Sequence, residues 1–340
     1  CGRVSIPFIT KRYAVNIASS MPGYPVAAVI PALLLLVSGC VSQAPNTAAP
    51  ANASHVELIS TPFHPQTQYH CGPSALATVL GSSGLEISPE RMSREVYLPG
   101  RKGTLQLEII AAVRRHGRIP YQLDGNLQAI LGQLDADLPV LVLLNQGIGM
   151  FPAWHYATVI GYQPGTDSVI LRSGSDFRLE MSRRRFENDW KKAGYWSLVV
   201  LQPGQFPASV DMGRYLNALI AMEEAGQWKA VETGYQAVLS HSPEDSPVNR
   251  LARFGLANAL RADNQLEAAV MEYKQLLSRD PGHLSARNNL ADTLLALGRC
   301  NEATETIDRI DPDPAIEPAI SAAIHATRAE IYATCTGVRP

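Results

Sequence analysis

The chain has 340 residues, of which 46% are hydrophobic and 18% are charged, and its formal net charge is −2. That length predicts about two domains, each large enough to fold on a hydrophobic core without a disulfide framework or a metal. Lysine and arginine number 29 against 31 acidic residues, and no basic run is longer than Arg183-Arg184-Arg185. This balance argues against nucleic acid as the main partner.

An apolar segment near the start of the chain, residues 26–37, is followed by Ser38, Gly39 and Cys40. It is too short for a membrane-spanning helix, which needs about 20 residues, and it has the size of the apolar core of a secretory signal. The sequence Val37-Ser38-Gly39-Cys40 resembles the lipobox of bacterial lipoproteins, in which the cysteine sulfur accepts diacylglycerol. We therefore expect residues 1–39 to be a lipoprotein signal peptide and Cys40 to be lipidated. The alternative is an ordinary signal peptide with a chance cysteine.

Residues 40–54 are rich in Ala, Pro, Asn and Ser, a composition typical of a flexible tether. Val41, rather than Asp, follows the cysteine, and the resemblance to lipoproteins then implies sorting to the outer membrane. The sequence thus predicts a protein of the cell envelope at the periplasmic face of the outer membrane. Its contact with the membrane would be the lipid anchor only.

Residues 55–204 show helical patterns first and strand patterns later, which predicts an α+β domain with an antiparallel sheet. Ser88, Thr104 and Asn126 are the candidate helix caps. The expected helices are 73–80, 89–96, 105–116 and 127–134, and the expected strands are 140–144, 156–162, 168–171 and 195–201.

Residues 209–338 are helical in pattern and contain a repeat. Ala269 and Ala303 are 34 residues apart, the period of tetratricopeptide repeats, and a related unit around Ala230 lies 39 residues before Ala269. We expect an all-α solenoid of such repeats, ending in a capping helix at 315–334, and the alternative is an unrelated helical bundle. From Pro207 onward there are 12 basic and 18 acidic residues, net −6, which favours a protein partner over an anionic one.

Five cysteines are present, and Cys1 and Cys40 belong to the leader and the lipidation site. Cys300 and Cys335 both lie in the repeat region and are the natural disulfide pair of an exported protein. Their Cα atoms must then lie within about 7 Å of each other. Cys71 is left unpaired.

Cys71 stands where a helix should begin, and a helix N-terminus favours the thiolate. Gln66, five residues upstream, can donate its side-chain amide to an oxyanion, with Gln68 as the competing donor. His155, at the start of an apolar strand, is the candidate general base. Trp154 and Tyr156, on either side of His155, are either walls of a cleft or part of the core. A packing role for a buried cysteine is the alternative reading of Cys71.

Together these residues resemble the papain-like peptidases that process the double-glycine leaders of bacteriocins. The resemblance covers about 150 residues and rests on Gln66, Cys71-Gly72-Pro73-Ser74-Ala75 and His155-Tyr156-Ala157-Thr158-Val159-Ile160-Gly161-Tyr162. It implies a papain-like fold, with Cys71 as nucleophile, His155 as base, Gln66 as oxyanion donor and no cofactor or metal.

One position departs from that family, in which an Asp orients the imidazole. Ser173 stands where the Asp is expected, and Asp176 lies nearby. A serine hydroxyl can accept from Nδ1–H and fix the tautomer, but it cannot stabilise imidazolium as a carboxylate does. A Cys–His pair can still act without an acid, because a thiol ionises easily.

The sequence therefore predicts an exported, lipid-anchored cysteine peptidase that cleaves peptide or protein substrates, with the repeats recruiting a protein partner. Two alternatives remain open. The domain could be a catalytically inactive binding module of the cell envelope, or a peptidoglycan amidase of papain-like fold.

Overall fold

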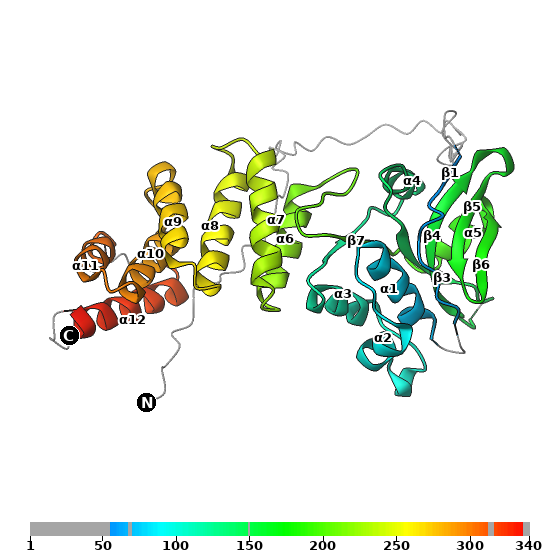
Figure 1. Ribbon diagram of the computed structural model, residues 1–340, viewed down its shortest axis with the longest axis horizontal. Helices are drawn as coiled ribbons and strands as arrows, with labels where there is room; N and C mark the ends of the chain where they lie inside the picture. The colour runs from blue at the N-terminus through cyan, green and yellow to red at the C-terminus, as the bar shows by residue number, and fades with distance from the viewer. Residues whose placement is uncertain (1–54, 67–69, 149, 312–315, 336–340) are drawn as a thin grey trace, which may run out of the picture.

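The computed structural model describes residues 55–66, 70–148, 150–311 and 316–335. An α+β domain and an array of paired helices follow one another along the long axis of the molecule (Figure 1). The expected signal peptide, the tether and Cys40 lie outside the described residues. Within the described ranges, no helix combines the length and the apolar character needed to cross a membrane.

A seven-stranded sheet forms the centre of the α+β domain. Its order is β2–β7–β3–β4–β5–β6, β1 pairs with β4, and every pairing is antiparallel. The strands are β1 (Val56–Glu57), β2 (Ile119–Gln122), β3 (Val140–Asn145), β4 (Trp154–Gln163), β5 (Ser168–Ser173), β6 (Asp176–Ser182) and β7 (Ser197–Leu201). The expected fold class, an α+β domain with an antiparallel sheet, is confirmed.

Helices cover both faces of the sheet. Leu141 and Leu143 share a core with one set of helices, whereas Val140 and Val142 belong to the core on the opposite face, because side chains alternate along a strand. Burial on both faces explains why β3 is apolar throughout. The first set is α1 (Cys71–Ser82), α2 (Pro89–Val96) and α3 (Gln106–Arg115), and the second is α4 (Leu127–Asp135) and α5 (Arg183–Lys191).

Two of the three expected helix caps are present. Ser88 Oγ accepts from the Arg91 N–H at 3.3 Å, and Asn126 Oδ1 accepts from the Ala129 N–H at 2.8 Å. The expectation for Thr104 is wrong, because α3 begins one residue later and Leu105 occupies the cap position. The elements that the sequence did not predict are β1, β2, β6 and α5. Strand β6 lies at an edge with mostly exposed side chains, so it lacks an apolar pattern.

Seven helices form the C-terminal part of the described chain. They are α6 (Met212–Glu223), α7 (Trp228–His241), α8 (Pro247–Ala262), α9 (Leu266–Arg279), α10 (Leu284–Ala296), α11 (Cys300–Asp308) and α12 (Pro318–Cys335). Gly226, Asn264 and Gly298 precede α7, α9 and α11, and each has a positive φ, of 70°, 60° and 73°. The same left-handed turn thus recurs at the same place in each helix pair, as expected of a repeat.

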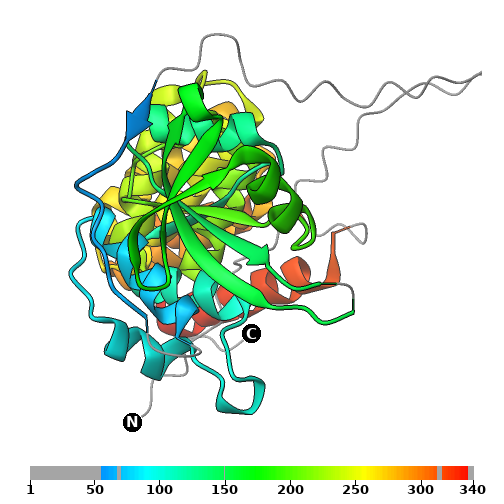
Figure 2. The ribbon, with the colours of Figure 1, turned by 90° about the vertical axis from the view of Figure 1, so that its right-hand side faces the viewer.

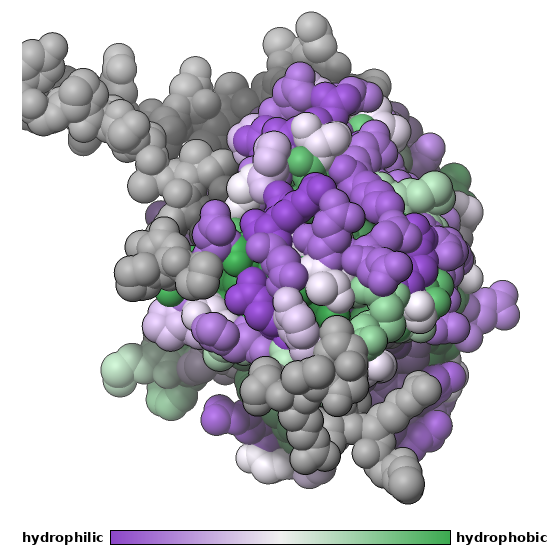
Figure 3. All heavy atoms as spheres, turned by 90° about the vertical axis from the view of Figure 1, so that its left-hand side faces the viewer, coloured by the Kyte–Doolittle hydropathy of each residue, from purple (hydrophilic) through white to green (hydrophobic). Residues whose placement is uncertain are grey.

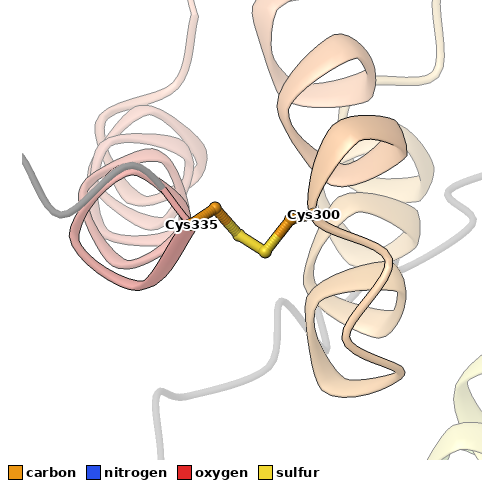
Figure 4. The surroundings of a disulfide bond; sticks show 2 residues. All are labelled: Cys300 and Cys335. Carbon is orange, nitrogen blue, oxygen red and sulfur yellow. A yellow bond between two sulfur atoms is a disulfide. The ribbon is translucent and has the colours of Figure 1, made fainter.

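The last helix closes the array. Ile320, Ile324 and Ile331 of α12 are buried, and a disulfide joins Cys335 at its end to Cys300 at the start of α11 (Figure 4). The two Cα atoms are 5.4 Å apart, within the range that a disulfide requires. Seen from this end, the surface is mainly hydrophilic (Figure 3), which is what a terminal repeat needs in water.

The array packs directly against the α+β domain. Figure 2 shows the sheet standing in front of the stacked helices. The Tyr121 hydroxyl on β2 accepts from the Asp211 N–H at 2.9 Å, at the start of α6. Arg214 on α6 pairs with Asp124 at 2.7 Å. The hydrophobic core between α4 and the sheet is continuous with the core of the helical array. Buried apolar contacts as well as polar ones therefore hold the two parts together.

Candidate active site

Cys71 is the first residue of α1, which packs on the central sheet beside β4. The side chain is half-buried and is the free cysteine of the described residues. Burial raises the pKa of the thiol, while hydrogen bonds from the backbone N–H groups of Tyr156 and Gly72 act to lower it. The net effect is a pKa above the ordinary value, so the resting thiol holds its proton at neutral pH.

His155 is the second residue of β4, and its ring is held by Ser173 at the end of the neighbouring strand β5. The distance from His155 Nε2 to Ser173 Oγ is 2.8 Å. The sequence predicted a contact between Ser173 and Nδ1 of His155. The contact with Ser173 is present, but it is made by Nε2, because the ring turns Nε2 toward β5. In the tautomer in which Nε2–H donates to Ser173, Nδ1 carries the lone pair that a base needs.

Cys71 and His155 line the same cleft. Within the described part of the chain, no hydrogen bond joins the thiol to the imidazole, and such bonds are often long before a substrate binds. Burial lowers the pKa of His155, just as it raises that of Cys71. Both effects favour the neutral thiol and the neutral imidazole over an ion pair.

Gln66 is fixed at the edge of the cleft by its own backbone. Its N–H donates to the Gly174 carbonyl at 3.2 Å, which places it next to Ser173, and it lines the cleft together with Cys71. The competing residue, Gln68, lies outside the described residues. Gln66 is thus available as an amide donor at the cleft that Cys71 lines.

Asp176 does not take the place of the missing carboxylate. It is exposed at the start of β6, where it is the register partner of Ser173 across the turn. Its side chain forms no hydrogen bond or ion pair with any residue that the structure describes. The serine, rather than the aspartate, is therefore the residue that contacts the imidazole.

The cleft has a volume of about 910 Å³, large enough for an extended peptide. Trp154 is 55% exposed and forms part of its wall. The lining residues are Gln66, Cys71, Gly100, Arg101, Lys102, Gly103, Thr104, Leu105, Gln106, Leu143, Trp154, His155, Tyr156, Gly174, Ser175 and Ala193. The described residues contain no cluster of three or more side chains that could hold a metal ion.

The sequence did not reveal the role of Thr104 and the loop before it. The Tyr156 hydroxyl donates to the Thr104 carbonyl at 3.3 Å, and the Thr104 side chain lies against Gly72, where an added Cβ would sit 2.6 Å from it. This loop therefore packs beside the nucleophile. In the sequence, its Pro-Gly-Arg-Lys-Gly stretch indicates only a turn.

Comparison with known proteins assigns both parts of the chain. Residues 58–198 match the model of the Peptidase_C39 like family, and residues 260–324 match a tetratricopeptide repeat model. The chain therefore carries a C39-like peptidase domain followed by tetratricopeptide repeats, which confirms both resemblances found in the sequence.

Two individual proteins are similar to parts of the chain. Cellulose synthase 1 operon protein C of Komagataeibacter xylinus is 30% identical over 122 residues, which represent 33% of this chain and only 9% of that protein. The crystal structure of a putative C39-like peptidase from Bacillus anthracis shares 15% identity with a TM-score of 0.38. That match covers 44% of this chain and 98% of the other.

Proposed function

We propose that the protein is an exported, lipid-anchored cysteine peptidase that cleaves peptide bonds with Cys71 and His155. The observation that carries the proposal is the shared cleft. It contains an unpaired thiol at a helix start and an imidazole whose Nε2 is held by Ser173. These are the parts that nucleophilic catalysis by a thiol requires: a nucleophile, a base and a group that orients the base.

The reaction begins from neutral partners. As the substrate carbonyl approaches, Nδ1 of His155 takes the thiol proton, and the sulfur attacks the carbonyl carbon. The C–N bond then breaks, and the departing amine takes the proton from His155, which leaves a thioester on Cys71. A water molecule that gives its proton to His155 hydrolyses the thioester and restores the thiol. Ser173 keeps the ring in one orientation throughout.

The negative charge that develops on the carbonyl oxygen needs donors. Two are available in the cleft: the backbone N–H of Cys71, at the start of α1, and the side-chain amide of Gln66. Donors of this kind contribute most when they are fixed before the reaction starts. The backbone bond from Gln66 to Gly174 supplies that rigidity.

The remaining features of the proposal concern location and partners. The lipobox-like sequence at Cys40 supports a lipid anchor at the periplasmic face of the outer membrane. The disulfide between Cys300 and Cys335 is consistent with an oxidising compartment. The repeats would recruit a protein partner, since stacked helix pairs offer extended surfaces for peptides.

The proposal is tested by digesting a mixture of peptides that includes Gly-Gly sequences with the full chain and with its Cys71→Ser variant. Mass spectrometry of new termini should show cleavage by the wild type and none by the variant. Peptidoglycan fragments form a second arm, and cleavage confined to them would replace the peptidase by an amidase.

A non-catalytic, peptidase-like binding module is the second candidate. It is favoured by the serine in place of a carboxylate and by the raised pKa of the thiol. If no peptide and no peptidoglycan fragment is cleaved in the same experiment, the catalytic proposal fails and this candidate stands.

A further inference from the structure

The charged side chains that line the cleft are all basic. They are Arg101 and Lys102, both on the loop that precedes α3. No aspartate or glutamate belongs to the described lining. The described lining of the cleft is therefore basic, and charge of one sign between low-dielectric walls is felt strongly by a ligand.

The two cations sit on a loop with a defined conformation. The loop contains a short turn, η1 (Pro99–Arg101). The Leu98 N–H donates to the Gly103 carbonyl at 2.9 Å, and the Arg101 N–H donates to the Leu98 carbonyl at 3.0 Å. Lys102 has a φ of 47°, a conformation that costs free energy outside glycine and persists where the surroundings impose it. The backbone from which the two side chains extend therefore has a defined conformation.

This loop is also tied to the nucleophile. The Thr104 carbonyl accepts from the Tyr156 hydroxyl, and the Thr104 side chain rests on Gly72, next to Cys71. Tyr156 in turn directs its backbone N–H to the thiol. Arg101 and Thr104 are three positions apart in the chain, so their Cα atoms lie within about 11 Å of each other. Arg101 and Cys71 line the same cleft, so a substrate bound there can contact both residues.

Arg101 differs from the arginines of the helical array that form ion pairs. Arg253 pairs with Glu272 at 2.5 Å, and Arg299 pairs with Glu302 at 2.6 Å. Arg101 is exposed and forms no ion pair with any residue that the structure describes. Its planar guanidinium presents donors in a fork that matches both oxygens of a carboxylate.

From these observations we infer that Arg101, with Lys102 beside it, recognises a carboxylate of the substrate next to the bond that is cleaved. The inference rests on the proposed function and adds to it the class of substrate. The carboxylate could come from an acidic residue of a polypeptide or from a peptidoglycan stem peptide, since both present the same group.

The test compares two alkylating reagents on Cys71 of the full chain: iodoacetate, which is an anion, and iodoacetamide, which is neutral. Mass spectrometry of the Cys71 peptide gives the ratio of the two rates. In the double variant Arg101→Gln/Lys102→Asn the ratio should fall by about threefold for each charge removed, the effect of a unit charge about 7 Å away in water. Asparagine tolerates the left-handed conformation at position 102.

Arg94→Gln is the matched control, because Arg94 is exposed on α2 and does not line the cleft. It should leave the ratio unchanged. An unchanged ratio in the double variant, with an unchanged thermal unfolding curve, would overturn the inference. Both reagents alkylate any accessible thiol, so the ratio can be measured even if the chain has no peptidase activity.

The source of the carboxylate is decided by paired substrates. One pair is a peptide with Glu and its Gln counterpart, and the other is a stem peptide with free and with amidated carboxylates. The inference is supported if the wild type cleaves the member with the free carboxylate faster in either pair, and the pair that shows this identifies the source. In the double variant this preference should disappear through a change in KM rather than in kcat. Equal cleavage of the members of both pairs contradicts it.

Discussion

The hydrogen bond between Ser173 and His155 orients the imidazole without adding a charge to it. Removing it in Ser173→Ala should lower the rate of peptide cleavage about tenfold, the effect of losing one hydrogen bond of roughly 1–1.5 kcal/mol. Ser173→Asp should act differently, because a carboxylate beside Nε2 raises the pKa of His155. The base is then protonated at higher pH, so the acid limb of the pH–rate profile should move upward.

The control for this pair of variants is Asp176→Asn, which removes a carboxylate that does not contact the ring. Its pH–rate profile should match that of the wild type. If Ser173→Ala and Ser173→Asp also left the profile and the rate unchanged, Ser173 would have no part in orienting His155.

Gly72 is required by the close approach of Thr104 to the helix that carries the nucleophile. A Cβ at position 72 would lie 2.6 Å from Thr104, whereas one at Gly100, on the same side of the cleft, meets nothing within 4 Å. Gly72→Ala should therefore lower the free energy of unfolding by about 1–3 kcal/mol, and Gly100→Ala should leave it nearly unchanged. Urea denaturation of both variants checks this, and equal stabilities would disprove the packing argument.

At the scale of elements, the disulfide fastens α12 to the end of the array. The bond closes a loop with a sequence separation of 35 residues, which corresponds to about 3–4 kcal/mol of stability in the chain-entropy model. Cys300→Ser/Cys335→Ser should thus unfold at a lower urea concentration, monitored by helical circular dichroism. Reductant should lower the urea midpoint of the wild type in the same way and leave that of the double variant unchanged. Equal midpoints for the oxidised wild type and the double variant would show that the buried face of α12 holds this helix without the disulfide.

Helices α6 and α7 are joined by a buried pair, in which the Tyr235 hydroxyl donates to Glu223. Burial raises the pKa of Glu223 to about 7. The folded state then keeps a proton that the unfolded chain releases near pH 4.5, so this pair loses stability as the pH rises from about 4.5 to 7. The loss is on the order of 3 kcal/mol.

Glu223→Gln removes this titration, so the difference in unfolding free energy between variant and wild type should grow in favour of the variant over the same pH range. Denaturation at pH 5 and pH 7.5 measures it, and a constant difference would rule out the raised pKa.

Apolar periodicity and capping residues made most elements predictable, such as α2 behind Ser88 and the buried strand β3. These patterns failed where tertiary contacts, rather than the local sequence, determine the structure. Thr104 has the chemistry of a cap but is used to pack on Gly72, and the edge strand β6 has no buried face to leave a pattern. In the site, the local sequence around Cys71 and around His155 was enough to predict both as candidate catalytic residues. The ring nitrogen that meets Ser173, and the basic loop at Arg101, depend on how strands and loops are placed in space.

At the scale of the whole molecule, the peptidase-like domain and the repeats share one continuous core, while their charges differ. The acidic half is the repeat array, and the cleft in the other half is lined by basic side chains. The polar contacts of Tyr121 and Arg214 fix α6 against the sheet. A partner held by the repeats would therefore be kept at a set position relative to the domain that contains Cys71.

The central claim is that Cys71 is a nucleophile activated by His155. It is tested most directly by the rate at which a peptidyl epoxide, which reacts with activated thiols of papain-like sites, labels Cys71 in the wild type and in His155→Ala. We expect labelling of Cys71 in the wild type and a rate at least about a hundredfold lower in the variant, since a positioned base usually contributes that much. Equal rates in the two proteins, or no labelling of folded wild type, would contradict it.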